Sequence, residues 1–477
     1  MTRTECVMFL QDLEQRFDAG SLRFQGIRIW PLVRVKIGEW IVRNEVRPGA
    51  AKGYTPRTMS GQLGTLFSGC LNYASWWWRM PRADILIHSS DRLRLELHDV
   101  IHDRFTDPLV AAASTLDLGS LVIDRDQAAG PTAPMAFRAT RFDISAAIEA
   151  CALLHWRRPF PLPDAVPGLA GLLAHVALSV ATDERYLMDQ LHSFTFYLRF
   201  HRRLLRLSKP KCVFVICWYT MENMAIAQAC HEAGVRCVEM QHGVQGPAHI
   251  AYGNWTAIGP EGYSLMPHIF WCWDQLSAEH INKWAADTPH RALPLGHPWQ
   301  TMSPAPDMPS PWKPDGRKRI LFTAQPLQEL LPNVLLEAIR ATINDAQWMI
   351  RVHPNRPEML PTIIADLRTA GLSDAVVIDD PRSSPLTTVL EGCSLHVTSF
   401  SSVVIEASAA GVPSTAVHPN AAGLFPEYLA SGALSMALEA EQLIAKVRSA
   451  TALERQNIAL PPLSERLRAA METPLAA

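Results

Sequence analysis

Serines and histidines follow short apolar runs at several places in the chain, where their side chains could hold phosphate groups or move protons. From Leu395 to Pro413 the order is an apolar run, a cluster of hydroxyls, an Ala-rich segment with helical spacing, and Gly-Val-Pro. This order predicts a strand, a turn, a helix and a stop, which is half of a βαβ unit. Ser401 or Ser402 is placed to cap the helix, whose free N–H groups would then attract an anion. We interpret the stretch as a phosphate or diphosphate cradle; a capped helix that binds nothing is the alternative.

Side chains at the ends of other predicted strands suggest the same chemistry. His353, within Arg351-Val352-His353-Pro354, should project from the carboxyl end of its strand and donate to a phosphate oxygen, while Pro354 stops the ladder. Glu406 lies one turn into the helix after the serines, within reach of ribose hydroxyls. Taken singly, each residue could equally be a surface polar group. Because strands of one sheet converge on one edge, we expect a nucleotide site formed by Gln325, Arg351, His353, Pro354, Ser399, Ser401, Ser402 and Glu406.

A second cluster, Gln241-His242-Gly243, follows a strand in the first half of the chain. Histidine titrates near neutral pH, so His242 suits a general base that removes a proton from an acceptor hydroxyl. Gly243 would let the backbone turn sharply beside it. A histidine with a purely structural role is the alternative, and His249, Tyr252 and Asp274 compete for the role of base. The residues predicted to bind the second substrate are Gln241, Gly243, His249 and Asp274.

The elements that would position these residues alternate between strand and helix, which predicts parallel sheets. In the first half, strands are expected at 83–88, 121–124, 211–218, 235–240, 269–273 and 292–295. A helical stretch separates the first two, and residues 145–207 look mostly helical. In the second half, strands are expected at 319–323, 347–352, 375–378, 394–398 and 414–417, alternating with helices at 333–343, 361–370 and 386–391.

This alternation predicts an α/β protein of two Rossmann-like, doubly wound domains that face each other across a cleft. The N-terminal domain would span residues 1–300 and carry helical additions. A Pro-rich linker at 301–317 would join it to a nucleotide-binding domain at 318–477. The last predicted helix, about residues 464–471, is a candidate to pack back across the interface.

Bulk properties narrow the function classes. With 477 residues the chain is long for one core, so two domains are expected. A formal net charge of -2 argues against a nucleic-acid binder. The nine cysteines form no CxxC pair, no acidic pair has metal-ligand spacing, and no signal peptide is evident. The apolar tract 165–181 is too short to span a bilayer. We therefore expect a cytoplasmic protein that needs neither a metal nor another cofactor.

Two segments could contact a membrane surface. Trp76, Trp77 and Trp78 stand beside Arg79 and Arg82, which could form an aromatic and basic edge that rests on the inner membrane. A Trp-rich core helix is the alternative. A basic run follows later, with Arg199, Arg202, Arg203, Arg206, Lys209 and Lys211. A solvated helix face explains that run most simply, although an anionic membrane or acceptor would also be attracted by it.

Together, Gln-His-Gly in the first domain, and His-Pro with Ser-Phe-Ser-Ser-Val-Val-Ile-Glu-Ala in the second, resemble GT-B glycosyltransferases of bacterial capsule and surface polysaccharide synthesis. The motifs are most similar to those of CDP-glycerol glycerophosphotransferases and of capsule transferases that use CMP-activated Kdo or sialic acid. The resemblance covers about residues 210–420 by motif. The run Ile29 to Arg34 also resembles capsule transferases. Gln241 stands where the glycerophosphotransferases have Trp, and their Asp-Tyr before the serines is absent.

The resemblance implies a mechanism without a metal. His242 matches the family's base, His353 matches its phosphate donor, and Ser401 and Ser402 match its phosphate cradle. The acceptor hydroxyl would lose its proton to His242 as it attacks the sugar carbon, and Arg351 could help to stabilise the departing phosphate. The implied partners are a CMP- or UDP-linked sugar donor and a glycan or glycolipid acceptor.

Two alternatives remain open at this point. An isomerase that resembles UDP-N-acetylglucosamine 2-epimerase would share the twin-domain plan and a similar Ser-Ser…Glu helix, and it would need no acceptor. A polysaccharide-assembly subunit could bind nucleotide or lipid without catalysis.

Overall fold

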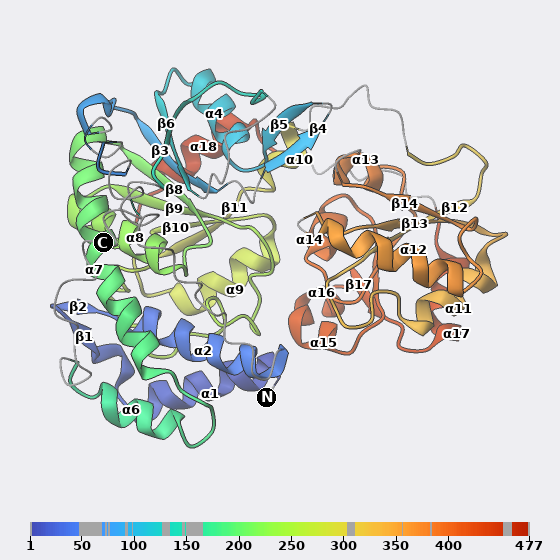
Figure 1. Cartoon of the computed structure of the whole chain (residues 1–477), viewed down its shortest axis with the longest axis horizontal. Helices are drawn as coiled ribbons and strands as arrows, with labels where there is room; N and C mark the ends of the chain where they lie inside the picture. Colours follow the sequence, from blue (N-terminus) through green and yellow to red (C-terminus); the bar gives the residue numbers. More distant parts are fainter. Residues whose placement is uncertain are drawn as a thin grey trace.

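A computed structural model describes residues 2–46, 69–71, 74, 77–90, 94–97, 99–125, 134–145, 148, 166–302, 311–354, 356–381, 384–451 and 460–475. Two α/β domains lie side by side (Figure 1). The first contains a seven-stranded parallel sheet of β3 (Ile85–Ser90), β6 (Ser120–Arg125), β7 (Thr140–Asp143), β8 (Cys212–Ile216), β9 (Arg236–Met240), β10 (Ile269–Cys272) and β11 (Arg291–Pro294). The second contains a six-stranded parallel sheet of β12 (Lys318–Thr323), β13 (Ala346–Arg351), β14 (Val376–Asp379), β15 (Leu395–Thr398), β16 (Ser414–Ala416) and β17 (Leu434–Met436).

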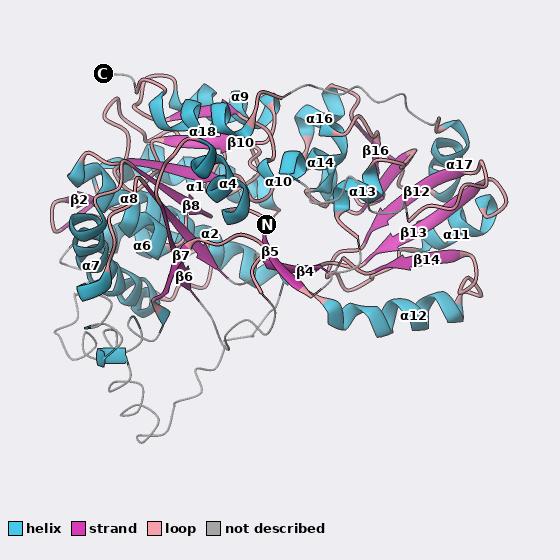
Figure 2. Ribbon diagram, turned by 90° about the horizontal axis from the view of Figure 1, so that it is seen from above, coloured by secondary structure: helices cyan, strands magenta, loops and turns pink. Residues whose placement is uncertain are grey.

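Helices cover both sheets (Figures 1 and 2). The N-terminal domain carries α1 (Arg3–Arg16), α2 (Trp30–Val46), α4 (Thr106–Thr115), α6 (Leu169–Val176), α7 (Glu184–Ser208), α8 (Met221–Ala233), α9 (Gln275–Ala285) and α10 (Pro298–Met302). The later helices are α11 (Asn333–Thr342), α12 (Leu360–Thr369), α13 (Leu386–Leu390), α14 (Val403–Ala409), α15 (Asn420–Leu424), α16 (Pro426–Ala430), α17 (Ala440–Ser449) and α18 (Leu463–Glu472). Strands such as β8, β10, β13 and β15 are buried along their whole length, because a parallel sheet covered on both faces has no solvent side.

Both sheets have the same strand order. In spatial order they read β11-β10-β9-β8-β3-β6-β7 and β14-β13-β12-β15-β16-β17. Numbered along the chain within each sheet, this is the Rossmann order 3-2-1-4-5-6, with one extra strand at the end of the first sheet. The order reverses between β3 and β8 in one domain and between β12 and β15 in the other. The predicted fold class, two Rossmann-like doubly wound domains that face each other across a cleft, is confirmed.

The two domains also contact each other outside the cleft. The hydroxyl of Tyr428 on α16 donates to Asp274 Oδ2 after β10. A side chain at Gly246 would meet the carbonyl oxygen of Leu424 at 3.1 Å, so glycine permits the close approach. The chain then returns to the first domain, where α18 packs against α4 and Arg466 donates to the carbonyl of Leu295 at 2.7 Å (Figure 1). The return across the interface expected for the last helix is confirmed.

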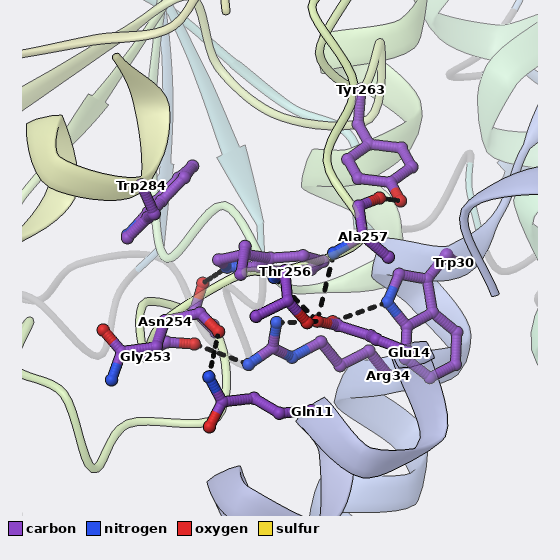
Figure 3. A network of polar contacts seen from close by, with 12 residues as sticks. Gln11, Glu14, Trp30, Arg34, Gly253, Asn254, Thr256, Ala257, Tyr263 and Trp284 are labelled. Carbon is purple, nitrogen blue, oxygen red and sulfur yellow. Dashed lines mark hydrogen bonds and ion pairs between the residues drawn. The ribbon is translucent and has the colours of Figure 1, made fainter. Parts of the chain in front are cut away.

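The run Ile29 to Arg34 has a structural role (Figure 3). Glu14 on α1 accepts hydrogen bonds at 2.8 Å from both Trp30 Nε1 and Arg34 Nη1 on α2. Its second oxygen accepts from the backbone of Thr256 at 2.8 Å, and Arg34 Nη2 donates to Gly253 O at 2.5 Å. The side chains of Glu14 and Arg34 are fully buried. The ion pair therefore ties both N-terminal helices to the loop that follows Gln-His-Gly.

Several elements differ from the prediction. The helical stretch expected between β3 and β6 contains the hairpin β4 (Arg94–Leu97) and β5 (Val100–Asp103) as well as α4. Strands β7 and β17 and the short hairpin of β1 (Arg23–Phe24) and β2 (Ile27–Arg28) were not predicted. Most of the expected linker, residues 303–310, and Trp76 lie outside the described residues. Among the helices that the structure describes, none is both long and apolar enough to cross a bilayer.

Buried histidines should make stability depend strongly on pH. Burial lowers the pKa of six of them from about 6.5 to between about 2 and about 4: His242, His249, His268, His290, His297 and His396. Below pH 6.5 the unfolded chain binds protons at these sites and the native chain does not, so their contribution to stability is lost as the pH falls. Three carboxyls with a pKa raised to about 7 or 8, Asp107, Glu239 and Glu406, act in the opposite sense.

Six histidines favour proton uptake on unfolding and three carboxyls oppose it. Well below pH 6.5, unfolding therefore takes up about three protons at these sites. We therefore expect the free energy of unfolding to be greatest near pH 6.5 and to fall by ~4 kcal/mol per pH unit below about pH 6. Urea unfolding at pH 6.5 and pH 5.5 measures this change. His396, whose ring nitrogens lie 2.9 Å from the hydroxyls of Thr323 and Ser414, provides a control: His396→Gln should reduce the slope. Equal stability at both pH values would contradict the expectation.

Candidate active site

A cleft of about 420 Å³ lies between the two domains. On the N-terminal side it is lined by the hairpin β4–β5 and by the loops after β9, β10 and β11. On the C-terminal side the walls are the loops after β12, β13 and β14, the helix α13 and the start of α14. The strand ends at its walls are carboxyl ends of parallel strands, where open α/β sheets bind ligands. The cleft is therefore the candidate active site.

His242 lines this cleft directly after β9, as predicted from Gln-His-Gly. Its Nε2 lies 3.2 Å from the hydroxyl of Tyr219, and its Nδ1 lies 3.9 Å from Glu239 Oε1. Burial lowers the pKa of His242 to about 4, so the ring is neutral at pH 7. A neutral imidazole can accept a proton, which is the state that a general base requires.

Glu239 supports the region behind His242. It is fully buried and accepts from the Trp218 backbone N–H at 3.1 Å, from Gln245 Nε2 at 3.3 Å and from the Tyr252 hydroxyl. Burial raises the pKa of Glu239 to about 8. Tyr252 is 1% exposed and its hydroxyl is engaged by Glu239, which leaves His242 as the group of this network that reaches the cleft.

Cationic side chains line the same cleft as His242. Arg351 and His353 project from the end of β13, as predicted, and Arg104 approaches from the hairpin side. Arg351 is held in place by Asp379 and by Ser384 O at 2.8 Å. Burial lowers the pKa of His353, and the nearby Arg356 and Arg104 cations add to the effect. His353 is then a neutral N–H donor, and together with the two guanidiniums it makes the cleft suited to a phosphate group.

A carboxyl and a histidine meet across the domain interface at the same place. Glu406 Oε1 lies 3.9 Å from His297 Nε2. Burial raises the pKa of Glu406 to about 7, although Arg104 and Arg351 favour its charged form. The backbone N–H of Trp299 donates to His297 Nδ1 at 3.1 Å, so the neutral ring carries its proton on Nε2, toward Glu406. Glu406 can therefore gain or lose a proton near neutral pH, while His297 stays neutral and presents an N–H toward it.

The serine turn differs in part from the predicted cradle. Ser402 is the N-cap of α14, and Ser401 and Ser402 line the cleft. The expected free N–H groups are absent from the first three residues of α14: Val403 donates to Ser401 Oγ at 3.3 Å, Val404 to Ser401 O at 3.2 Å and Ile405 to Ser402 O at 2.9 Å. The short helix satisfies its own amides. What this turn can offer a phosphate group is therefore chiefly the serine hydroxyls, which supplement the neighbouring cations.

Solved structures align with most of the chain. No model of a known protein family and no curated protein sequence matches it. The structure of UDP-GlcNAc 2-epimerase from Methanocaldococcus jannaschii aligns with 80% of this chain and 97% of its own, at 12% identity and a TM-score of 0.46. The Neisseria meningitidis enzyme bound to UDP-GlcNAc aligns with 81% and 99%, at 12% identity and a TM-score of 0.44. The calicheamicin glycosyltransferase CalG4 aligns with 82% and 94%, at 13% identity and a TM-score of 0.41. These values are low, so the site is assigned from its own residues.

Three residues predicted to bind the second substrate hold the N-terminal fold together. Gln241 is fully buried; its amide donates to Gly243 O at 2.9 Å and accepts from the Trp273 N–H at 2.5 Å. Gly243 lies at a bend, as expected, although its φ is not left-handed and a Cβ there would meet open space. Asp274 caps α9 through the N–H of Ser277 at 2.9 Å, in addition to its contact with α16.

Of the remaining predicted residues, Pro354 lines the main cleft and the others do not. His249 lines a separate cavity of about 250 Å³ that also contains Arg3, Glu39 and Tyr219. Gln325 accepts from the Phe400 N–H at 2.7 Å and so holds the turn before the serines. Ser399 is 2% exposed and faces another cavity, of about 450 Å³, within the C-terminal domain. Pro354 lines the main cleft, as expected.

Arg104 and His297 are among the cleft residues that were not predicted as site residues. Arg104 follows β5, in the segment expected to be helical. His297 follows β11 within Gly296-His297-Pro298. The latter repeats the strand-then-His-Pro pattern of His353-Pro354, and this repetition is the signal that would have identified His297. Its ring stacks between Trp273, at a centroid distance of 4.2 Å, and Phe105, at 6.2 Å.

Proposed function

We propose that this chain is a glycosyltransferase that moves a sugar from a CMP- or UDP-linked donor to a hydroxyl of a glycan or glycolipid acceptor. The observation that carries the proposal is the placement of His242 in one cleft with Arg104, Arg351 and His353. The two arginines and the N–H of His353 can bind the phosphate of the leaving nucleotide. The neutral imidazole of His242 can accept the proton of the attacking hydroxyl.

In the proposed reaction the acceptor oxygen forms a bond to the anomeric carbon while the bond from that carbon to the phosphate oxygen breaks. The electron pair stays on the phosphate, where Arg104, Arg351 and His353 offset the added negative charge. The acceptor proton moves to His242 Nε2, for which Tyr219 must give up its 3.2 Å contact. Ser401 and Ser402 would donate hydroxyl hydrogens to the phosphate, and Glu406 would contact the ribose. No metal takes part in this scheme.

The pair of Glu406 and His297 favours a second candidate, a sugar-nucleotide isomerase. An isomerase must remove and return a proton at a sugar carbon, and a carboxyl with a pKa of about 7 beside an N–H donor can do so. Such an enzyme would change the donor without any acceptor.

Incubation of the full chain with CMP- and UDP-linked sugars, with and without glycan acceptors, separates the two functions. Mass spectrometry would follow intact donor, epimer, free nucleotide and the acceptor product. Glycosyl transfer predicts nucleotide release that requires an acceptor, together with an acceptor that gains one sugar. Epimer formation from the donor alone would establish the isomerase instead. Binding without any turnover would contradict both candidates.

A further inference from the structure

One tryptophan of the N-terminal domain stands almost wholly in solvent. Trp78 is 92% exposed, whereas its neighbour Trp77 is 8% exposed. Large aromatic side chains are usually buried, and an exposed one is informative when other groups accompany it. Arg79 and Arg82, just after Trp78, are exposed as well.

Trp77 joins this segment to α7. Its ring lies 5.7 Å from that of Phe200, and the Arg203 guanidinium lies 4.5 Å above it. The two stretches, more than 100 residues apart in the sequence, therefore form one surface. Trp78 and Arg79 directly follow Trp77 in the chain, which brings them near the basic half of α7.

The outer face of α7 is strongly positive over its last turns. Arg199, Arg203, Arg206 and the C-cap Lys209 are exposed at helical spacing, while most of the intervening apolar residues are buried. No acidic residue occurs between positions 190 and 221. Glu232 pairs with Arg202 at 2.6 Å. The patch is local, because the whole chain has a formal net charge of -2.

This patch faces away from the active site. In Figures 1 and 2, α7 runs along the side of the N-terminal domain opposite the C-terminal domain. A partner bound to this patch would leave the cleft accessible. Basic side chains around an exposed tryptophan match a lipid interface, where Trp sits at the headgroup level and Lys and Arg meet anionic lipids. A nucleic-acid binder would be expected to carry a basic charge over the whole domain, which this chain lacks.

We propose that the surface formed by Trp78, Arg79, Arg82, Arg199, Arg203, Arg206 and Lys209 binds anionic lipid bilayers. The cations are attracted to the negative headgroups, and Trp78 inserts its ring at the boundary between headgroups and acyl chains. The proposal is independent of the reaction in the cleft, although a lipid-linked acceptor would be presented by such a surface.

Sedimentation of the full chain with vesicles tests this proposal. One set of vesicles consists of phosphatidylcholine, and the other has a third of its lipid replaced by phosphatidylglycerol. We expect binding to the anionic vesicles alone, weakened by salt and reduced at least about tenfold by Trp78→Ser and by the double change Arg199→Glu/Arg206→Glu. All three side chains are exposed, so the fold should tolerate these changes.

Matched controls lie outside the patch. Leu178→Ser removes an apolar side chain that is 81% exposed before the other end of α7, and Arg340→Glu/Arg368→Glu reverses two exposed charges on α11 and α12. Both should keep wild-type binding. Equal binding to neutral vesicles, or full binding by Trp78→Ser, would overturn the proposal. The proposal would also be overturned if the chain bound heparin more strongly than vesicles and Trp78→Ser did not change that binding. The partner would then be a polyanion or an acidic protein. Thermal shift with nucleotides tests the cleft separately in each variant.

Discussion

Replacing His242 with alanine should lower the rate of sugar transfer by about 10²- to 10⁴-fold and leave nucleotide affinity within about twofold of the wild type. The imidazole, which we propose as the base, is neutral at pH 7 and lies in one cleft with Arg104, Arg351 and His353, which would hold the phosphate. Its loss removes the acceptor of the proton and no contact to the nucleotide. Steady-state kinetics with saturating acceptor, together with calorimetric titration of the nucleotide, measure the two effects.

The pH profile adds a second readout for His242. Because burial lowers its pKa to about 4, the acidic limb of the kcat/KM profile should lie well below pH 6.5. Tyr219→Phe is the matched control: it removes the hydroxyl 3.2 Å from Nε2, keeps the ring, and should retain most of the rate. A His242→Ala variant with full activity would show that another group accepts the proton, and Glu406 would be the next candidate.

Replacing Arg34 with leucine should reduce the free energy of unfolding by about 3–5 kcal/mol. The change removes the cation that pairs with the buried Glu14 at 2.8 Å and leaves the carbonyl of Gly253 without its donor (Figure 3). An uncompensated buried carboxylate is expensive, whereas an exposed ion pair contributes little. Urea unfolding, followed by tryptophan fluorescence, gives the change as a shift in the first transition.

Helix α1, which carries Glu14, provides the control for Arg34. Arg16 pairs with Asp12 at 2.8 Å on the exposed side of α1, and Arg16→Ala should cost less than about 1 kcal/mol. If Arg34→Leu lost as little stability as Arg16→Ala, the buried network could not be the interaction that holds α1 and α2 to the loop at 253–257. Loss of activity that accompanied an unchanged stability would instead favour a direct role of Arg34 in the reaction.

Much of the fold could be predicted from the sequence because most of its strands are buried on both faces. Such strands are continuous apolar runs, as in Cys212–Ile216, and they stand out between amphipathic helices. The missed strands lack that signal. Thr140–Asp143 is a polar strand at one edge of the first sheet and has one neighbour. Leu434–Met436, at one edge of the second sheet, has only three residues. The hairpin β4–β5 belongs to neither large sheet and has charged residues at both ends.

The site was predictable only where a strand end points into the cleft. His242 follows a predicted strand of the first sheet, and His353 and the serines follow predicted strands of the second. The carboxyl ends of these strands lie at the cleft between the two domains, which brings the residues together. Arg104 depends on tertiary structure: its hairpin is held over the sheet by Arg94 bonded to Asp124 at 2.6 Å and by Ser89 bonded to Asp103 at 2.7 Å. No local sequence pattern predicts those contacts.

Polar residues near the motifs were harder to assign. Gln241 and Gln325 also lie at strand ends, but their amides satisfy backbone groups of buried loops. A buried loop needs such partners, and a sequence motif does not distinguish a glutamine that serves the backbone from one that serves a ligand. The same holds for Asp274, which caps a helix and receives the hydroxyl of Tyr428.

The proposed reaction requires a nucleotide that binds between the domains and contacts both of them. Calorimetric titration of UDP and CMP into the wild type, Arg104→Met, His353→Ala and Arg356→Ala tests this directly. Arg104 lies on the N-terminal wall and His353 on the C-terminal wall, while Arg356 is an exposed cation three residues from His353 that pairs with Glu358. Loss of one charge-assisted or donor contact should weaken binding by about 10- to 100-fold. We predict that loss for Arg104→Met and for His353→Ala, and wild-type affinity for Arg356→Ala. Wild-type affinity in both cleft variants would contradict the account.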